Sequence, residues 1–442
     1  MRFTASLVFP ILIVILIVGT AALAQNTTKD AAQSVTVPMT LDQGRIVIDV
    51  DLLLPDGSTE RARGWVDNGN PDLYTTERVA KLMGLSVSCV GQVCSGTSSS
   101  RDLSHGIAIG GMKISLSPIK EAKVPAGASA LAPGMSAEIN IPSSVLRNYD
   151  LLINYPDREF TIGLPGRLKF NGVPSKMRVN ANNGLIQIPS KIENKNLDLG
   201  LDLGSSINFL SEELFDKLAN AHPDWPHMTG AVGPFNTGET TETKWRLMRV
   251  DRVQYGPLFL TDVAVAGIPA DLSRADRSKD IPKDPNNQLP LFEQRIGFAT
   301  AGLLGSEALL NYRVGLDYAH ATVYFDIGRT VRFPDFDVVG LILRPEGDTG
   351  FTIAGVADFD GNPSVPNGQD GVQAGDHLLA VGDTPVAELT LGQTWSLLEG
   401  SPGQERKLTI ARAGKQFTIV AKVQHFLGDV PHDDARGKSK KN

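Results

Sequence analysis

The chain has 442 residues and a formal net charge of −7, and it is 41% hydrophobic and 21% charged, with 44 glycines and 27 prolines. This mixture is too apolar for a disordered chain and too irregular for a coiled coil or collagen. The negative charge argues against a nucleic-acid partner bound through its phosphates. The length argues for two to four domains.

The N-terminus has the features of an export signal. Arg2 precedes an apolar run over residues 7–18, and Ala22-Leu23-Ala24 offers a small-x-small cleavage site. An uncleaved membrane anchor is the alternative, because the apolar run continues to Ala24 and could just span a bilayer. We therefore expect an exported protein, periplasmic or secreted, with residues 1–24 as its signal peptide. Membrane contact is expected only through an uncleaved N-terminus.

Short strands dominate the pattern from residue 35 to about residue 330. Residues 45–52 alternate apolar and polar side chains at a period of two, which predicts a half-buried strand. A turn at residues 55–58 leads to a second strand that ends at Val66. Helices are predicted where a hydroxyl residue precedes a glutamate, at residues 76–83 and 211–220.

Cys89 and Cys94 are the only cysteines in the sequence. An exported chain meets an oxidising compartment, in which two cysteines so close in sequence are expected to form a disulfide at a hairpin tip. Two free thiols are the alternative. A metal site is not expected, because two cysteines without a second group of ligands do not complete a coordination set. No cofactor is predicted.

An internal repeat divides this region into two halves. Residues 143–155 return 163 positions later as residues 306–318, with Ser, Leu, Asn and Tyr in matching places. Upstream, each half has an apolar strand, an Asp-x-Gly and a short predicted helix. We therefore predict two related β-rich lobes, residues 35–165 and 166–330.

The duplicated Asp-x-Gly is the strongest chemical signal in the sequence. A pseudo-two-fold axis between the lobes would bring Asp67 and Asp202 together. Two carboxyl groups a few ångströms apart do not readily both ionise, so the pair can hold a water, accept its proton and polarise a carbonyl. Asp67 and Asp202 are the predicted catalytic residues. The loops around them are expected to supply Asn68, Gly69, Leu203, Gly204 and Ser205.

A different pattern begins after Arg332. Residues 351–356 indicate a strand, residues 371–383 a tight turn into a strand, and residues 391–398 have helical spacing. A hairpin is predicted over residues 408–420 around an Ala-Gly-Lys turn. Residues 331–428 are therefore expected to form a small α+β domain. Residues 429–442 form a basic tail that is predicted to be disordered.

The two halves resemble the bacterial-type exported aspartic peptidases, retropepsin-like or pepsin-like. In that family each lobe carries Asp-Thr/Ser-Gly and, later, two apolar residues followed by Gly. The second half has Asp202-Leu203-Gly204 and Leu303-Leu304-Gly305, whereas the first has Asp67-Asn68-Gly69 and Ile141-Pro142. The C-terminal segment resembles a PDZ domain. The resemblance implies a mainly β fold of duplicated lobes, endopeptidase activity and a polypeptide substrate or peptide ligand.

The resemblance also suggests residues that contact peptide. A glycine-bearing flap over the substrate is expected at Gly230 and Gly233. The carboxylate-binding loop of a PDZ domain is expected at four neighbouring residues, Val339, Gly340, Leu341 and Ile342.

Three positions depart from the family pattern. The family's Thr or Ser after each Asp makes reciprocal hydrogen bonds across the lobe interface. The Asn68 amide can donate and accept such bonds, whereas Leu203 cannot, and Pro142 has no backbone N–H. A catalytically silent peptide-binding protein is therefore the alternative function.

Overall fold

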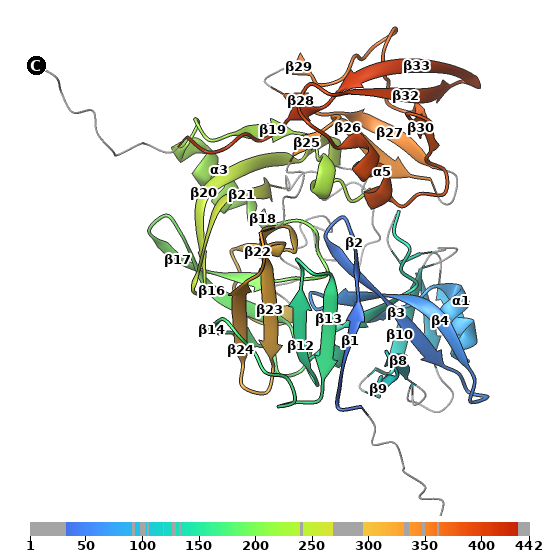
Figure 1. Ribbon diagram of the computed structural model, residues 1–442, viewed down its shortest axis with the longest axis vertical. Helices are drawn as coiled ribbons and strands as arrows, with labels where there is room; N and C mark the ends of the chain where they lie inside the picture. Colours follow the sequence, from blue (N-terminus) through green and yellow to red (C-terminus); the bar gives the residue numbers. More distant parts are fainter. Residues whose placement is uncertain are drawn as a thin grey trace, which may run out of the picture. The chain divides into compact units, whose positions relative to one another are not determined.

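The computed structural model describes residues 32–431, apart from residues 91–92, 98–102, 104–105, 118, 126–129, 132–133, 239–241, 268–294, 331–335, 347–349 and 360–361 (Figure 1). The predicted signal peptide, residues 271–294 and most of the predicted C-terminal tail lie outside the described residues. The fold is mainly β, as the sequence predicts. In the part of the chain that is described, no helix is long and apolar enough to cross a bilayer.

Two sheets and two short helices make up the first half of the repeat. The larger sheet has the order β11-β4-β3-β8-β9, with β2 paired to β3, and the smaller one has the order β5-β10-β7-β6. Their strands are β2 (Thr40–Asp42), β3 (Arg45–Leu53), β4 (Thr59–Asp67), β5 (Leu73–Tyr74), β6 (Ser86–Val90), β7 (Val93–Thr97), β8 (Ile107–Ile109), β9 (Met112–Ile114), β10 (Glu121–Pro125) and β11 (Ile139–Pro142). The helices are α1 (Glu77–Leu82) and α2 (Ser143–Leu146).

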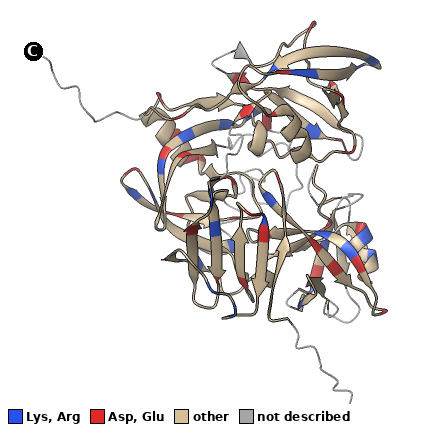
Figure 2. Ribbon diagram, in the orientation of Figure 1, with Lys and Arg blue, Asp and Glu red and all other residues tan. Residues whose placement is uncertain are grey.

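The predicted strand at residues 45–52 and the predicted helix at residues 76–83 are both confirmed as β3 and α1. Thr76 caps α1 by accepting a hydrogen bond from the Val79 N–H, which fixes where this helix begins. On the outer face of the β3–β4 hairpin, Arg61 and Arg63 of β4 pair with Asp49 of β3, so basic side chains face acidic ones across the strands (Figure 2). Exposed pairs like these contribute little stability, and they mark the face of the hairpin that meets water.

The second half of the repeat is built on a ten-stranded sheet. Its order is β15-β16-β17-β22-β18-β21-β20-β19-β28-β29. The strands are β15 (Arg178–Val179), β16 (Ile186–Ile192), β17 (Lys195–Leu201), β18 (Phe209–Leu210), β19 (His227–Thr229), β20 (Arg246–Tyr255), β21 (Leu258–Gly267), β22 (Gly302–Leu304), β28 (Asp358–Phe359) and β29 (Asn362–Pro363). The helices are α3 (Glu212–Ala221), which begins after its Ser211 cap as predicted, and the 3₁₀ turns η1 (Gly233–Phe235), η2 (Glu242–Lys244) and η4 (Glu307–Leu309).

A six-stranded sheet joins the two halves (Figure 1). Its order is β1-β13-β12-β23-β24-β14. The strands are β1 (Ser34–Pro38), β12 (Asp150–Asn154), β13 (Glu159–Gly163), β14 (Val173–Lys176), β23 (Tyr312–Asp317) and β24 (Thr322–Ile327). At its centre β12 pairs antiparallel with β23, and Leu152 lies opposite Gly315. Because Gly315 is 163 positions after Leu152, the register is symmetric under the repeat.

The C-terminal segment, residues 336–431, contains a further sheet with the order β26-β27-β30-β32-β33, in which β31 also pairs with β30. Its elements are β25 (Asp337–Val338), β26 (Leu341–Pro345), β27 (Phe351–Val356), β30 (His377–Val381), β31 (Thr384–Pro385), α5 (Leu391–Leu398), β32 (Glu405–Arg412), β33 (Lys415–Lys422) and β34 (Gln424–His425). The predicted strand at residues 351–356, the helix at residues 391–398 and the C-terminal hairpin are confirmed. This segment is not separate from the second half, because β28 pairs with β19.

Candidate active site

Equivalent strand pairs position the two aspartates. In the first half, β4 pairs in parallel with β11, and Asp67, the last residue of β4, lies opposite Pro142. In the second half, β17 pairs in parallel with β22. Asp202 follows the last residue of β17, and its N–H donates to the Leu304 carbonyl at 3.0 Å. Each aspartate therefore stands at the end of a buried strand, supported by a second strand that crosses behind it.

The structure brings Asp67 and Asp202 together through a reciprocal arrangement with two glycines. The Asp202 carboxyl group lies over the α-carbon of Gly69, and a side-chain carbon on Gly69 would overlap it. On the other side, a Cβ on Gly204 would lie only 2.5 Å from Oδ1 of Asp67. Neither position accommodates a side chain, so the two glycines allow each carboxyl group to reach the opposite loop.

The side chain of Asn68 connects the two loops through two hydrogen bonds. Its Nδ2 donates to the Leu201 carbonyl at 3.0 Å, and its Oδ1 accepts from the Leu203 N–H at 2.6 Å. Asn68 is fully buried. The side chain of Leu203, which cannot make a hydrogen bond, instead packs in the hydrophobic core.

The second loop has support of its own from Ser306, a residue of the repeated segment. The Ser306 hydroxyl donates to the Leu203 carbonyl at 3.0 Å and contacts the Tyr155 hydroxyl at 3.1 Å. From β4, the Trp65 indole donates to the Gly204 carbonyl at 3.1 Å. The loop that carries Asp202 is therefore fixed by residues of both halves.

Burial raises the pKa values of both carboxyl groups, and the Asp202 charge raises that of Asp67 further. Asp67 is 3% exposed, and burial followed by the Asp202 charge raises its pKa well above the usual value. Burial raises the pKa of Asp202 to about 6, against the opposing effect of hydrogen bonds from the Gly204 and Ser205 N–H groups. Asp67 therefore retains a proton over a pH range in which Asp202 has lost one.

Asn140 is the main contributor to the site that the sequence did not indicate. From the middle of β11, its Nδ2 donates to Oδ2 of Asp67 at 3.1 Å and to the Asp72 carbonyl at 3.0 Å, while its Oδ1 accepts from the Tyr74 N–H at 2.7 Å. The hydrogen bond to Asp67 opposes the rise in that carboxyl's pKa. The one available signal was a polar residue between Ile139 and Ile141 in a strand that is otherwise apolar.

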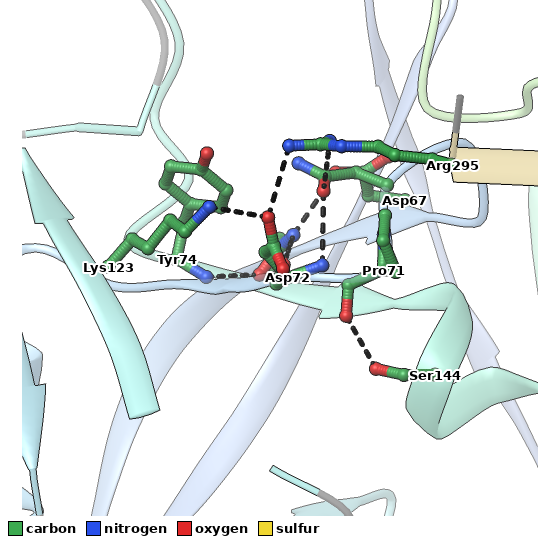
Figure 3. A network of polar contacts seen from close by, with 9 residues as sticks. Asp67, Pro71, Asp72, Tyr74, Lys123, Ser144 and Arg295 are labelled. Carbon is green, nitrogen blue, oxygen red and sulfur yellow. Dashed lines mark hydrogen bonds and ion pairs between the residues drawn. The ribbon is translucent and has the colours of Figure 1, made fainter. Parts of the chain in front are cut away.

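A second group of residues beside Asp67 carries charge (Figure 3). Arg295, from the second half, donates to Oδ1 of Asn70 and to Oδ2 of Asp72, both at 3.2 Å. Lys123 contacts the same Asp72 oxygen at 2.5 Å. The Arg295 charge also opposes the rise in the pKa of Asp67. No sequence motif marks Arg295, because its partners belong to the other half of the repeat.

The predicted flap glycines lie elsewhere. A Cβ on Gly230 would lie 2.8 Å from Cδ1 of Ile342, and one on Gly233 would lie 3.6 Å from Cγ1 of Val338. Both glycines pack against the C-terminal segment. The flap prediction for Gly230 and Gly233 is therefore corrected, because the apolar side chains around them are buried in a core shared with that segment.

The prediction of a carboxylate-binding loop at these four neighbouring residues, Val339, Gly340, Leu341 and Ile342, also needs correction. Val339, Leu341 and Ile342 are almost fully buried. The Leu341 N–H donates to the Val339 carbonyl at 2.7 Å, and the Gly340 carbonyl accepts from the Ala357 N–H at 2.8 Å. This loop uses these main-chain groups within its own segment, so it does not present them as an open site for a carboxylate.

The predicted disulfide lies at the β6–β7 hairpin. The two strands pair antiparallel with Cys89 opposite Cys94, and Cys89 is disulfide-bonded. Within the described ranges, no group of three His, Cys, Asp or Glu side chains could hold a metal ion.

Comparison with known proteins gives little further information. No family model matches the sequence, and no curated protein matches it. Among solved structures, the aspartic proteinase from Irpex lacteus is similar over 67% of this chain and 98% of its own length, with 11% identity and a TM-score of 0.38. A functional assignment therefore depends on the geometry of the site.

Proposed function

We propose that the protein is an aspartic endopeptidase that hydrolyses peptide bonds with a water held between Asp67 and Asp202. The observation that carries this proposal is the reciprocal arrangement in which each carboxyl group lies against the glycine of the opposite loop. The two carboxyl groups are held by two strand ends, two glycines and a bridging asparagine. An ordinary turn with the sequence Asp-x-Gly has no need of such an arrangement.

The chemistry follows from the unequal pKa values. In the starting state Asp67 is protonated and Asp202 is ionised. The water oxygen attacks the carbonyl carbon while the Asp202 carboxylate accepts a proton from that water. The Asp67 hydroxyl donates to the carbonyl oxygen, which becomes the second hydroxyl of a tetrahedral diol. Collapse of the diol returns one proton to Asp67 and transfers the other from Asp202 to the departing nitrogen. Water is consumed, and a carboxylic acid and an amine are released.

The proposal extends to the rest of the chain. The sequence features of the N-terminus support export to the periplasm or the exterior, and the PDZ-like C-terminal segment would bind a peptide or the end of a substrate. Because the pair must lose its first proton before it can accept one from water, and the pKa of Asp202 is about 6, we expect the acid limb of activity near pH 6.

The direct test compares cleavage of casein by the mature chain and by its Asp202→Asn variant between pH 4 and pH 8. The substitution removes the proton acceptor, so we expect a loss of about 10²- to 10⁴-fold in kcat/KM. Asp216→Asn is the matched control, because Asp216 is a half-exposed aspartate of α3 that pairs with Arg246. Activity that survives Asp202→Asn would exclude the pair from the mechanism. A wild-type chain without activity at any of these pH values would favour the silent peptide-binding alternative.

A further inference from the structure

Asn236, in the second half of the repeat, is inserted between β26 and α5 of the C-terminal segment. Its Nδ2 donates to the Leu343 carbonyl at 2.9 Å, and its Oδ1 accepts from the Leu343 N–H and from the Trp395 indole, both at 3.0 Å. β26 is the edge strand of its sheet, and Trp395 lies on α5. Asn236 is fully buried there.

These contacts reproduce those of a bound peptide. A strand that adds to a sheet edge accepts from an N–H and donates to a C=O of the same edge residue. The carboxamide of Asn236 offers one acceptor and one donor with the same chemistry as a peptide group. Asn236 therefore occupies the position of one ligand residue on β26.

Both ends of the same groove are also covered by the chain itself. At the end formed by Pro345 and Leu391, the Gly134 carbonyl accepts from the Leu391 N–H at 2.8 Å, and a Cβ on Gly134 would lie 2.6 Å from Cβ of Leu391. At the other end, the ring of Phe235 packs 5.4 Å from that of Phe336. The groove is thus filled by residues from both halves of the repeat.

The segment that carries Asn236 is held from behind by Glu242, which is completely buried. Glu242 accepts from the Thr237 N–H at 2.7 Å and the Gly238 N–H at 3.2 Å, and it also contacts Nδ2 of Asn236. These contacts hold the segment but do not belong to the groove. They therefore offer a way to loosen the internal ligand without altering its binding site.

A short path connects this segment to the loop of Asp202. Gln43, in the β2–β3 turn, donates to the Asn236 carbonyl. A Cβ on the next residue, Gly44, would lie 3.6 Å from Ser206 and from Ser306. Ser306 in turn holds the Leu203 carbonyl.

We propose that the groove between β26 and α5 is a peptide-binding site that the chain keeps occupied with residues 233–238, Asn236 being the internal ligand that an extended polypeptide must displace. The inference rests on the peptide-binding role proposed for the C-terminal segment. It does not depend on catalysis by the aspartate pair.

The test uses a fluorescein-labelled peptide with the sequence of residues 230–238, GAVGPFNTG, and measures its binding to the full chain by fluorescence anisotropy. All proteins carry Asp202→Asn so that the probe is not cleaved. Asn236 makes three neutral hydrogen bonds to the groove, so we expect Asn236→Ala to bind the probe about ten- to a hundredfold more tightly than the parent. A probe with Ala in place of its Asn should lose this gain.

Glu242→Gln provides a second variant in case Asn236→Ala does not fold, and it should also strengthen probe binding because it weakens the hydrogen bonds that hold residues 236–238. Asn196→Ala, at an exposed position near the start of β17, should bind the probe like the parent. Amide hydrogen exchange of Leu343 should quicken in Asn236→Ala while that of Ile353 stays slow. The proposal would be overturned if the parent and both variants bound the probe equally. It would also be overturned if Asn236→Ala failed to bind the probe although its Leu343 amide exchanged rapidly.

Discussion

Asn68 explains how the two Asp loops are held together without the hydroxyl residues that the resembled family has at the positions of Asn68 and Leu203. In that family one hydroxyl from each loop reaches across to the other. Here one carboxamide makes both connections, donating to the Leu201 carbonyl and accepting from the Leu203 N–H. Leu203 needs no polar side chain, because its contribution is a backbone N–H. Its own side chain adds apolar packing behind the loop.

Arg295 is expected to set the upper pH limit of activity. Its charge lowers the pKa of Asp67, so Arg295→Gln should raise that pKa further. The singly protonated pair would then persist to higher pH, and the basic limb of the kcat/KM profile should move upward. Lys123→Gln is the control, because it removes the other cation that contacts Asp72. A basic limb that stays in place or moves downward in Arg295→Gln would contradict this role.

The strand β11 shows how one polar side chain inside an apolar strand can organise a site. Asn140 is 1% exposed and joins β11 to Asp67, to the loop that follows Asp67 and to Tyr74 of β5. The equivalent region of the second half is held by a different hydrogen bond. There the Gly305 N–H donates to Oδ1 of Asn208 at 2.8 Å. Pro142, opposite Asp67, has no N–H to offer.

Asn140→Leu should therefore damage the site more than the fold. The substitution leaves the Tyr74 N–H and the Asp72 carbonyl without this partner, and Asp67 loses a hydrogen bond. We expect kcat to fall on the order of 10- to 100-fold and the free energy of unfolding to fall by about 1–3 kcal/mol. Urea denaturation and steady-state kinetics measure the two effects. Asn154→Leu, at the end of β12 where the amide donates to Asp157, is the matched control. Equal kinetic effects of the two substitutions would remove Asn140 from the site.

Local patterns predicted the elements well and the long-range contacts poorly. The alternation in residues 45–52 and the hydroxyl caps of α1 and α3 depend on near neighbours, so the sequence predicts them. The repeat predicted that Asp67 and Asp202 meet. Arg295 and the insertion of Asn236 into the β26 groove could not be predicted, because their partners are more than a hundred positions away and have no counterpart in the repeat.

Across the whole molecule, the aspartate pair is expected to lower stability at neutral pH. The pKa of Asp202 is near 3.8 when unfolded and about 6 when folded, so the folded chain binds the proton more tightly. Stability from this group is fully present below about pH 4, declines as the pH rises to about 6 and is constant above that. Asn does not titrate, so Asp202→Asn removes the penalty.

Asp202→Asn should therefore be more stable than the parent at pH 7, by an amount on the order of 1 to 3 kcal/mol, and this advantage should shrink toward pH 4. Thermal unfolding of both proteins between pH 4 and pH 7 measures the difference. Asp216→Asn, which removes a half-exposed carboxyl group of α3, is the control substitution. A pH-independent difference between Asp202→Asn and the parent would show that Asp202 does not have a raised pKa in the folded chain.

The symmetric six-stranded sheet also has a consequence for synthesis, because its central strand pair can form only after both halves of the chain have been made. β12 reaches its neighbour β13 within a few residues, but its other edge waits for β23, which emerges from the ribosome more than 150 residues later. Until then the first half has an open strand edge whose register also matches a second copy of β12, because Leu152 and Gly315 are equivalent positions. Open edges of this kind favour association between chains. A chaperone that holds the nascent first half would therefore protect it until its own second half closes the sheet.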